Sequence, residues 1–403
     1  LVSLWRKGSN PFISTNIILN ALYIKILFFN KIFFLVIHVY MENKICVYAI
    51  AKNEIKFVDR WFDSVKEADY VCVLDTGSTD GTYERLKDLN VITQQKKYDL
   101  FRFDVARNDS MKLIPKDATI CVCVDIDEFF VKGWSKILKE NWKDNTLRAR
   151  YRYTWNFNPD GSEGVVFMAD KIHKNNFFKW THPVHEILTC CKNIQYEIID
   201  LPQIQLNHKA DTTKSRANYL PLLELSVKEN PLDDRNVHYL GREYMFHGMY
   251  EKAIATLKTH LSLKSAVWKD ERSASLRYIA RCYGYLNDKI NQEKYLKLSL
   301  LETNHIREPY YELGIFYYEK NDYLTSALFF NEMFKIKERY LSYISDPICW
   351  GSVPYDYLSM CYYYLQDYDK AIQTINYAIL TNDDERLIKN REIFINLKNS
   401  LNC

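Results

Sequence analysis

The sequence predicts two folded parts, an α/β domain with a mainly parallel sheet and an all-α domain of helical repeats. The first half alternates short β-branched runs with segments of helical periodicity. From about Ala217 the chain is rich in Leu, Tyr, Ala and Lys at helical spacing and carries few strand signals. Because 403 residues are too many for one ordinary core, two domains are expected. We place them at residues 41–210 and 211–403, after an apolar extension over residues 1–40.

The α/β domain begins with an expected strand, Ile45–Ala51, which is followed by a helix over Phe57–Val65. A second buried strand, Tyr70–Leu74, leads through a turn that starts at Asp75 into a helix over Tyr83–Leu89. Two glycines in this turn allow backbone angles that other residues resist. Asp75 is therefore expected at the carboxyl end of its strand, which is where open α/β sheets bind their ligands.

Two further strands are expected at Val91–Gln94 and Ala118–Val124, so four strands alternate with helices in a sheet that is covered on both faces. The last strand runs into the acidic stretch Asp125–Glu128. Side chains at i and i+2 point the same way from an extended backbone, so Asp125 and Asp127 are expected to face one hard divalent cation that carries substrate phosphates. The alternative is a solvated acidic turn.

Four motifs occur in the order and rough spacing of GT-A glycosyltransferases, which have a Rossmann-like sheet: AKNE (Ala51–Glu54), LDTGSTDGT (Leu74–Thr82), ARN (Ala106–Asn108) and VDIDE (Val124–Glu128). More narrowly, the chain resembles the family 2 enzymes, and most of all the bacterial-type subset that joins such a domain to tetratricopeptide repeats. Those chains also carry a His-Glu pair, here His185–Glu186, and a later His, here His208. The resemblance covers essentially Met41 to the C-terminus. It is specific for nucleotide-sugar binding and unspecific for the sugar and the acceptor.

The resemblance implies a role for each matching position. Asp75 and Arg107 would contact the nucleoside, Glu54 would belong to the same pocket, and Asp125 would hold the ribose. Asp127 would bind the metal, Mn²⁺ or Mg²⁺. A divalent ion neutralises the leaving nucleoside diphosphate, and Arg107 could add charge-assisted hydrogen bonds. For Arg107 the alternative is a surface helix charge.

His208 follows a strand-like run, Ile204–Leu206, and could complete the metal site opposite Asp127, as a late His does in several GT-A enzymes. Imidazole is a softer ligand than water or carboxylate, so a His ligand would favour Mn²⁺ somewhat over Mg²⁺. A lone His is more often a hydrogen-bonded structural residue, and this alternative stays open.

Displacement with inversion at the anomeric carbon needs a base on the acceptor side. Family 2 enzymes often use an Asp of a Glu-Asp pair, and no such pair occurs in the expected region, residues 170–188. His185 and Glu186 are the nearest chemical equivalents and are the candidate catalytic residues, with Asp170 as an outside candidate. For His182, structural packing is the preferred interpretation.

The second half contains four helix-turn-helix units similar to tetratricopeptide repeats. Their characteristic residues lie at 239–253, 277–288, 311–323 and 357–371, and inserts such as Ser342–Tyr355 lengthen some units beyond the usual period of about 34 residues. Stacked units share a core and form a concave surface that usually binds peptide or another subunit. Core packing is the main role expected of their many Tyr residues.

The composition narrows the kinds of ligand, metal site and cellular compartment that are expected. A net charge of +3, without a Lys/Arg cluster interleaved with aromatics, gives nucleic-acid binding no support. The ten Cys lack a zinc spacing, so buried free thiols in a reducing compartment, the cytoplasm, are expected. Ile17–Tyr40 is apolar and long enough to span a bilayer, but Lys25 and Lys31 interrupt it. We expect translation to start at Met41, with a membrane anchor as the alternative.

The sequence thus predicts inverting transfer of a sugar from a metal-bound nucleoside-diphosphate sugar to a protein, peptide or glycan acceptor. UDP is the carrier that the resemblance favours. The helical domain could deliver the acceptor, and a homodimer is left open. One alternative is an interaction protein whose α/β domain is inactive. The other is a nucleotidyltransferase, which the lack of a Gly-rich basic loop after the first strand disfavours.

Overall fold

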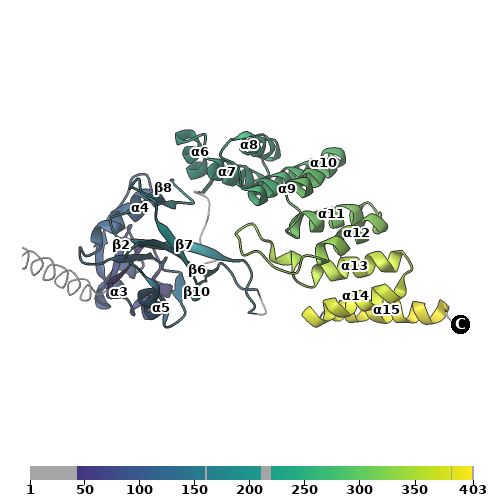
Figure 1. Cartoon of the computed structure of the whole chain (residues 1–403), viewed down its shortest axis with the longest axis horizontal. Coiled ribbons are helices and arrows are strands. Elements are labelled where there is room, and N and C mark those ends of the chain that lie inside the picture. Colours follow the sequence, from purple (N-terminus) through teal and green to yellow (C-terminus); the bar gives the residue numbers. More distant parts are fainter. Residues whose placement is uncertain (1–42, 159–160, 210–218, 383, 402–403) are drawn as a thin grey trace, which may run out of the picture. The chain divides into compact units, whose positions relative to one another are not determined.

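The structure, a computed structural model, describes residues 43–158, 161–209, 219–382 and 384–401. Its helices and strands belong to one compact unit that begins at Ile45 (Figure 1). The expected extension over residues 1–40 lies outside the described residues, and so does the expected boundary between residues 210 and 211. Among the described helices, none combines the length and the apolar character that crossing a bilayer requires.

A mixed β-sheet forms the centre of the α/β domain. The strands of this sheet and of a separate hairpin are β1 (Ile45–Ala51), β2 (Tyr70–Asp75), β3 (Ile92–Gln95), β4 (Ile120–Cys123), β5 (Glu128–Phe130), β6 (Thr146–Thr154), β7 (Val166–Lys174), β8 (Phe178–Thr181), β9 (Ile187–Cys190) and β10 (Glu197–His208). The sheet has the order β3-β2-β1-β4-β7-β6-β10-β5, while β8 pairs with β9. Strands β1 to β4 pair in parallel, which confirms the predicted fold class. The antiparallel strands β5 and β7 complete the sheet.

Both faces of the sheet are buried, as predicted. The domain's helices are α2 (Ile55–Val65), α3 (Thr82–Asp88), α4 (Phe103–Ser110) and α5 (Trp134–Asn141), with a 3₁₀ helix η1 (Met111–Leu113). Consecutive residues of β1 alternate between two core clusters, because Val47 packs with Trp61 and Trp134 while Cys46 and Tyr48 pack on the other side. The described cysteines are free thiols, most of them buried.

The acidic stretch after β4 differs from the expected extended backbone. Strand β4 ends at Cys123, and the chain turns so that the Glu128 N–H donates to the Asp125 carbonyl oxygen (2.9 Å). The turn lets β5 run back and pair with β10. Asp125 and Asp127 therefore contact different partners, and the prediction that they share one direction along an extended strand is wrong.

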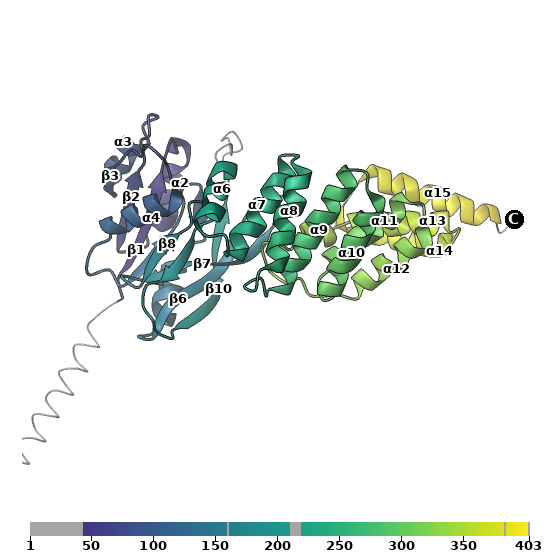
Figure 2. The same ribbon diagram turned by 90° about the horizontal axis from the view of Figure 1, so that it is seen from above.

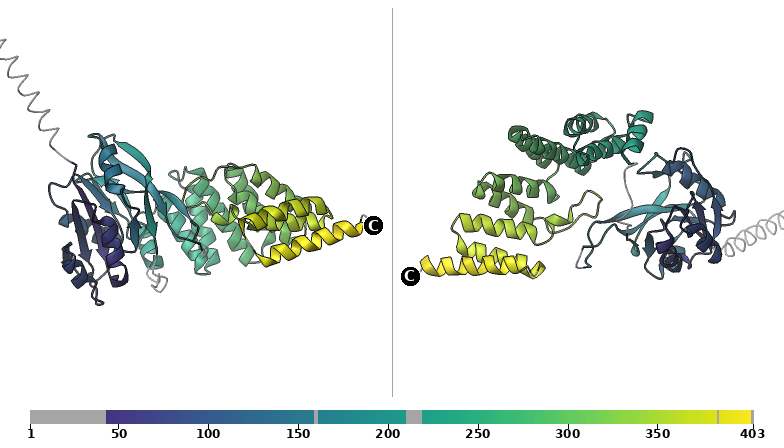
Figure 3. Two further views of the ribbon diagram at one scale, coloured as in Figure 1. Left: turned by 90° about the horizontal axis from the view of Figure 1, so that it is seen from below. Right: turned by 180° about the vertical axis from the view of Figure 1, so that it is seen from behind.

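The helical domain consists of antiparallel helix pairs. Its helices are α6 (Tyr219–Glu229), α7 (Asp234–Phe246), α8 (Tyr250–Ser262), α9 (Lys269–Tyr285), α10 (Lys289–Glu302), α11 (Glu308–Glu319), α12 (Tyr323–Phe334), α13 (Val353–Tyr364), α14 (Tyr368–Thr381) and α15 (Glu385–Leu401), with a 3₁₀ helix η2 (Pro347–Cys349) before α13. Each helix packs beside the one before it (Figures 2 and 3). The four predicted repeat units coincide with the pairs α7/α8, α9/α10, α11/α12 and α13/α14, which confirms the predicted repeat architecture.

The turns within the repeats have a common backbone conformation and a common N-cap. In three pairs, a residue with positive φ precedes an Asp whose side chain accepts a backbone N–H at the start of the second helix, namely in Asn287–Asp288, Asn321–Asp322 and Gln366–Asp367. Such an N-cap satisfies a helix N–H that has no partner within the helix. The same local solution therefore recurs although the sequence copies are weak.

The insert between α12 and α13 makes contacts that the sequence did not reveal. The Tyr343 ring stacks on Tyr239 of α7 (centroids 5.8 Å apart), and its hydroxyl donates to Glu271 of α9. Arg339 Nη2 donates to the carbonyl oxygen of Gly164 in the α/β domain (3.1 Å). The insert thus links a late repeat to the first repeats and to the α/β domain.

Candidate active site

The carboxyl ends of the parallel strands lie at one edge of the sheet, and the loops there carry the expected donor-site residues. Ala51 at the end of β1 lies in register with Asp75 at the end of β2. The backbone N–H of Glu54 donates to Thr82 Oγ1 (2.8 Å), which joins the loop after β1 to the loop after β2. Glu54 and Asp75, which were expected in one nucleoside pocket, therefore lie on two hydrogen-bonded loops.

The Asp75 carboxylate is fully buried, and its two oxygens differ. Oδ1 accepts hydrogen bonds from the backbone N–H groups of Gly77 (3.0 Å) and Ser78 (2.9 Å) and from Gln95 Nε2 (2.9 Å). Gly77 has φ 107°, a left-handed angle that lets the turn fold back over the carboxylate. Oδ2 is buried without a hydrogen-bond partner among the described residues. A buried acceptor without a donor costs about 1–3 kcal/mol, so Oδ2 suits a ligand that brings an N–H or O–H group.

Arg107 on α4 is the centre of a buried ion-pair network and not a surface charge, since its side chain is only 5% exposed. Nη1 and Nη2 donate to Asp125 Oδ1 (2.7 Å) and Oδ2 (3.1 Å), and Nε donates to Glu186 Oε1. The guanidinium also lies 5.1 Å from the Trp180 ring. Burial disfavours its charged form, but Asp125 and Glu186 outweigh burial and the pKa of Arg107 is raised. Arg107 thus joins the expected ribose-binding residue to the candidate base.

Lys171 and Glu128 complete this network, and the sequence did not single out Lys171. Lys171 Nζ on β7 lies 3.1 Å from both Asp125 Oδ2 and Glu128 Oε1. Glu128 also accepts from the Tyr153 hydroxyl (2.7 Å), and burial raises the pKa of Glu128. Burial would raise the pKa of Asp125 too, but Arg107 and Lys171 outweigh it and the pKa is lowered. Asp125 is therefore held as a carboxylate between two cations.

Asp170, the outside candidate for the base, does not belong to this network. Its side chain is 52% exposed and pairs with Arg148 Nη2 (2.7 Å).

Asp127 and His208, the two expected metal ligands, lie in contact. His208 Nε2 is 3.1 Å from Asp127 Oδ2, and Nδ1 is 2.8 Å from the carbonyl oxygen of Trp155. A carbonyl only accepts, so Nδ1 carries a proton and Nε2 is the nitrogen that can bind a metal. Burial would lower the pKa of His208, but the hydrogen bond to Asp127 outweighs it and the pKa is raised. A carboxylate oxygen beside an imidazole nitrogen fits Mn²⁺. Whether Nε2 of His208 carries a proton or a metal ion, the Asp127 carboxylate is the group that would contact it.

The loop between β8 and β9 carries the candidate catalytic pair and packs against the helical domain. His182 and His185 have positive φ (79° and 51°), which is uncommon for residues other than glycine. His182 Nε2 lies 2.7 Å from Oδ2 of Asp233, the N-cap of α7. The His185 ring stacks on Tyr239 of α7, with centroids 4.1 Å apart and planes 9° from parallel. The first repeat therefore holds the loop that carries Glu186, and no local sequence pattern recorded these contacts.

Comparison with known proteins found one matching family model and several similar solved structures. Residues 46–200 match the model of the family described as Glycosyl transferase family 2. No curated protein matches the chain. Among solved structures, a tetratricopeptide repeat protein from Parabacteroides merdae is 17% identical (TM-score 0.34, covering 45% of this chain and 67% of that chain). PilF of Pseudomonas aeruginosa is 11% identical (TM-score 0.34, 43% and 71%).

A third similar structure is the Cut9-Hcn1 assembly of the APC/C, with 16% identity and a TM-score of 0.36 over 45% of this chain. This chain covers 33% of that one.

The parallel strands, the motif loops at their carboxyl ends and the family match together identify the first domain. Residues 46–200 form a family 2 glycosyltransferase domain, which this chain joins to helical repeats of tetratricopeptide type.

Proposed function

We propose that the chain is an inverting glycosyltransferase that moves a sugar from a metal-bound nucleoside-diphosphate sugar, with UDP as the carrier, to a hydroxyl or thiol of a peptide or glycan. The observation that carries this proposal is the contact between Asp127 and His208, since it offers an oxygen and a nitrogen ligand to Mn²⁺ or Mg²⁺. The buried Oδ2 of Asp75 adds an acceptor that suits a nucleoside N–H, such as the imide of uracil.

In the proposed reaction, the acceptor oxygen or sulfur attacks the anomeric carbon while the bond from that carbon to the phosphate oxygen breaks. The electron pair of that bond leaves with the nucleoside diphosphate, whose charge the bound metal would offset. Asp75 orients the nucleoside, and Asp125, fixed by Arg107 and Lys171, accepts hydrogen bonds from the ribose. Glu186 takes the proton of the attacking group.

Glu186 is preferred to His185 as the base. Arg107 Nε holds Glu186 Oε1, and a carboxylate has a second oxygen that can face the acceptor. The His185 ring is stacked on Tyr239, so we assign His185 a positioning role. The helical domain would then both deliver the acceptor and hold the catalytic loop.

The direct test is a panel of nucleotide sugars presented to the purified chain with Mn²⁺, with and without chelator. Binding is followed by calorimetry and slow hydrolysis by release of the nucleoside diphosphate. We expect metal-dependent release from one donor, which would also identify the sugar. A folded chain that binds none of the donors would contradict the proposal and favour the interaction protein.

Asp75→Asn is expected to weaken UDP binding about 10- to 100-fold. The amide oxygen must stay with the N–H groups of Gly77 and Ser78, so the new NH₂ group would replace Oδ2 and meet a nucleoside N–H donor to donor. Loss of one buried hydrogen bond costs about 1–3 kcal/mol, which corresponds to this range. Calorimetric titration with UDP measures the effect. Unchanged affinity in a folded Asp75→Asn variant would place the nucleoside elsewhere.

Tyr239→Ala is expected to lower kcat about tenfold while the affinity for the donor changes little. The substitution removes the ring on which His185 stacks, so the loop with Glu186 loses a support, and a small misplacement of a catalytic group is costly. Tyr239→Phe keeps the ring and should retain the wild-type kcat. Steady-state kinetics, with thermal unfolding as a check, would contradict this role if Tyr239→Ala were folded and fully active.

A further inference from the structure

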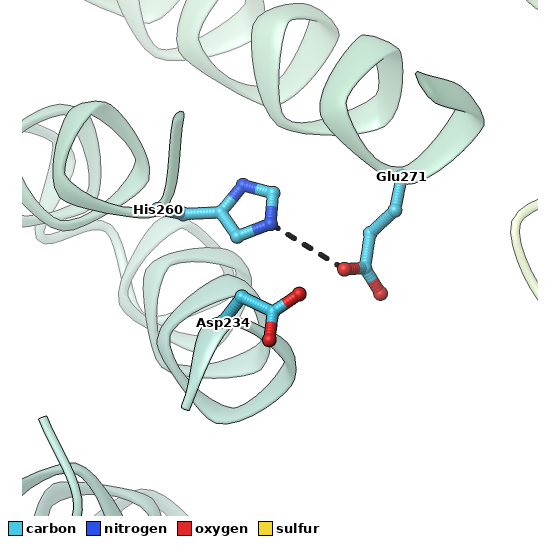
Figure 4. A group of neighbouring side chains, drawn as sticks. All are labelled: Asp234, His260 and Glu271. Atoms are coloured by element: carbon cyan, nitrogen blue, oxygen red, sulfur yellow. Dashed lines mark ion pairs between the residues drawn. The ribbon is translucent and has the colours of Figure 1, made fainter. Parts of the chain in front are cut away.

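A second group of metal-ligating side chains lies within the helical domain (Figure 4). Asp234 begins α7, His260 lies in the last turn of α8 and Glu271 lies in the first turn of α9. One ligand atom from each lies within 4.8 Å of the others, and His260 Nε2 is 3.4 Å from Glu271 Oε1. Three helix ends thus bring one imidazole and two carboxylates together.

A contact at Nδ1, the ring nitrogen that does not face the carboxylates, orients the His260 ring. Its Nδ1 lies 2.9 Å from Ser275 Oγ, and the same oxygen lies 2.7 Å from His238 Nδ1. The Ser275 hydroxyl lies between the two rings, so it can accept the Nδ1–H of His260 and donate its own proton to Nδ1 of His238.

This tautomer leaves a lone pair on Nε2 of His260. The ring is fully buried, and Nε2 has no hydrogen-bond partner among the described residues although it is directed at Glu271. A buried lone pair that faces two carboxylates is unfavourable unless a proton or a metal ion lies between them. Oδ or Oε atoms with one imidazole nitrogen are ordinary zinc ligands.

We propose that Asp234, His260 and Glu271 bind a divalent transition metal of the Zn²⁺ type, an inference that does not depend on the proposed glycosyl transfer. Three protein ligands leave one position of a tetrahedral site for water, and the partly exposed Asp234 provides the way in. Glu271 is steadied because its Oε2 accepts the Tyr343 hydroxyl. The nearby Arg235 guanidinium lies over the rings of Tyr239 and Tyr343 (5.2 and 5.7 Å), and although burial disfavours its charge, these rings together with Glu271 raise the pKa of Arg235.

A metal ion at this position would connect several helices. A bound ion would fasten the ends of α7, α8 and α9 and, through Tyr343, the insert before α13. Asp234 directly follows Asp233, the N-cap that pairs with His182. The ion would therefore stiffen the end of α7 that holds the catalytic loop.

The test uses the full chain without an affinity tag, carrying Asp127→Asn so that the proposed catalytic metal does not contribute. Chelator-stripped protein is titrated with Zn²⁺ by calorimetry and with Co²⁺, whose visible spectrum reports tetrahedral coordination. We expect one equivalent of Zn²⁺ and a higher unfolding temperature on binding. Asp234→Asn and Glu271→Gln, added separately, should each weaken Zn²⁺ binding about tenfold or more.

Asp234 is the main probe because it is only partly buried and Asn keeps its size, so the variant is expected to fold even if Glu271→Gln does not. Weakened Zn²⁺ binding in a folded Asp234→Asn variant supports the site. Two results would overturn it: no Zn²⁺ binding by the Asp127→Asn chain, or unchanged binding after Asp234→Asn. The cluster would then be a His-carboxylate ion pair only. Neither measurement involves sugar transfer, so its outcome is independent of the proposed enzyme.

Discussion

Asp127→Asn is expected to lower Mn²⁺-dependent turnover by about 10²- to 10³-fold. Asn keeps the size of the side chain but removes the negative charge that, beside His208 Nε2, would hold the metal. A metal that offsets the charge of the leaving diphosphate contributes several kcal/mol to the transition state, and each 1.36 kcal/mol corresponds to a factor of ten. The measurement is nucleoside diphosphate release over a Mn²⁺ titration, in which the apparent affinity for Mn²⁺ should also fall.

Asp200→Asn is the matched control for this variant. Asp200 lies in the same domain, and its two carboxylate oxygens accept from Arg150 Nε (2.5 Å) and Nη2 (2.8 Å). It is 51% exposed, so loss of its charge should leave turnover unchanged. Full activity of Asp127→Asn would exclude the proposed metal role. If the biological function of the chain also survived this variant, the interaction protein with an inactive α/β domain would be the better account.

The positions of Asp75 and His208 in the fold could be predicted from the sequence because local patterns encode them. Asp75 follows an apolar strand and precedes Gly77, so its place at the end of β2 and the turn that wraps its carboxylate both follow from its neighbours. His208 likewise ends a recognisable strand. Parallel pairing of β1, β2 and β4 then brings their carboxyl ends to one edge without further information.

The contacts that could not be predicted join segments far apart in the chain. Lys171 reaches Asp125 across 46 positions, and it does so only because β7 inserts antiparallel beside β4. The turn at Asp125 depends on β5 returning to pair with β10. The stack of His185 on Tyr239 depends on how the first repeat packs against the loop between β8 and β9. Each of these contacts depends on tertiary structure, which the periodicity of the sequence does not predict.

Arg107→Met is the second variant with a large expected effect, and it should reduce stability as well as turnover. It leaves Asp125 with Lys171 alone and Glu186 without its cation, at sites where the two carboxylates are 27% and 11% exposed. Breaking a buried ion pair by removing one partner costs about 3–5 kcal/mol, and we expect the lower end because Lys171 remains. Denaturant unfolding measures the loss of stability, and the transfer assay measures the loss of turnover.

Arg150→Met is the control that shows whether the loss of stability comes from burial of the ion pair or from the loss of any paired arginine. Arg150 makes the same two-pronged contact with Asp200, but the two side chains are 46% and 51% exposed, and exposed pairs contribute little to stability. Arg107→Lys separates charge from geometry, because one ammonium cannot reproduce the fork that reaches both Asp125 and Glu186. It should regain part of the stability and little of the turnover. If Arg107→Met were as stable as Arg150→Met and as active as the wild type, Glu186 would not be held by Arg107, and its assignment as the base would lose its structural support.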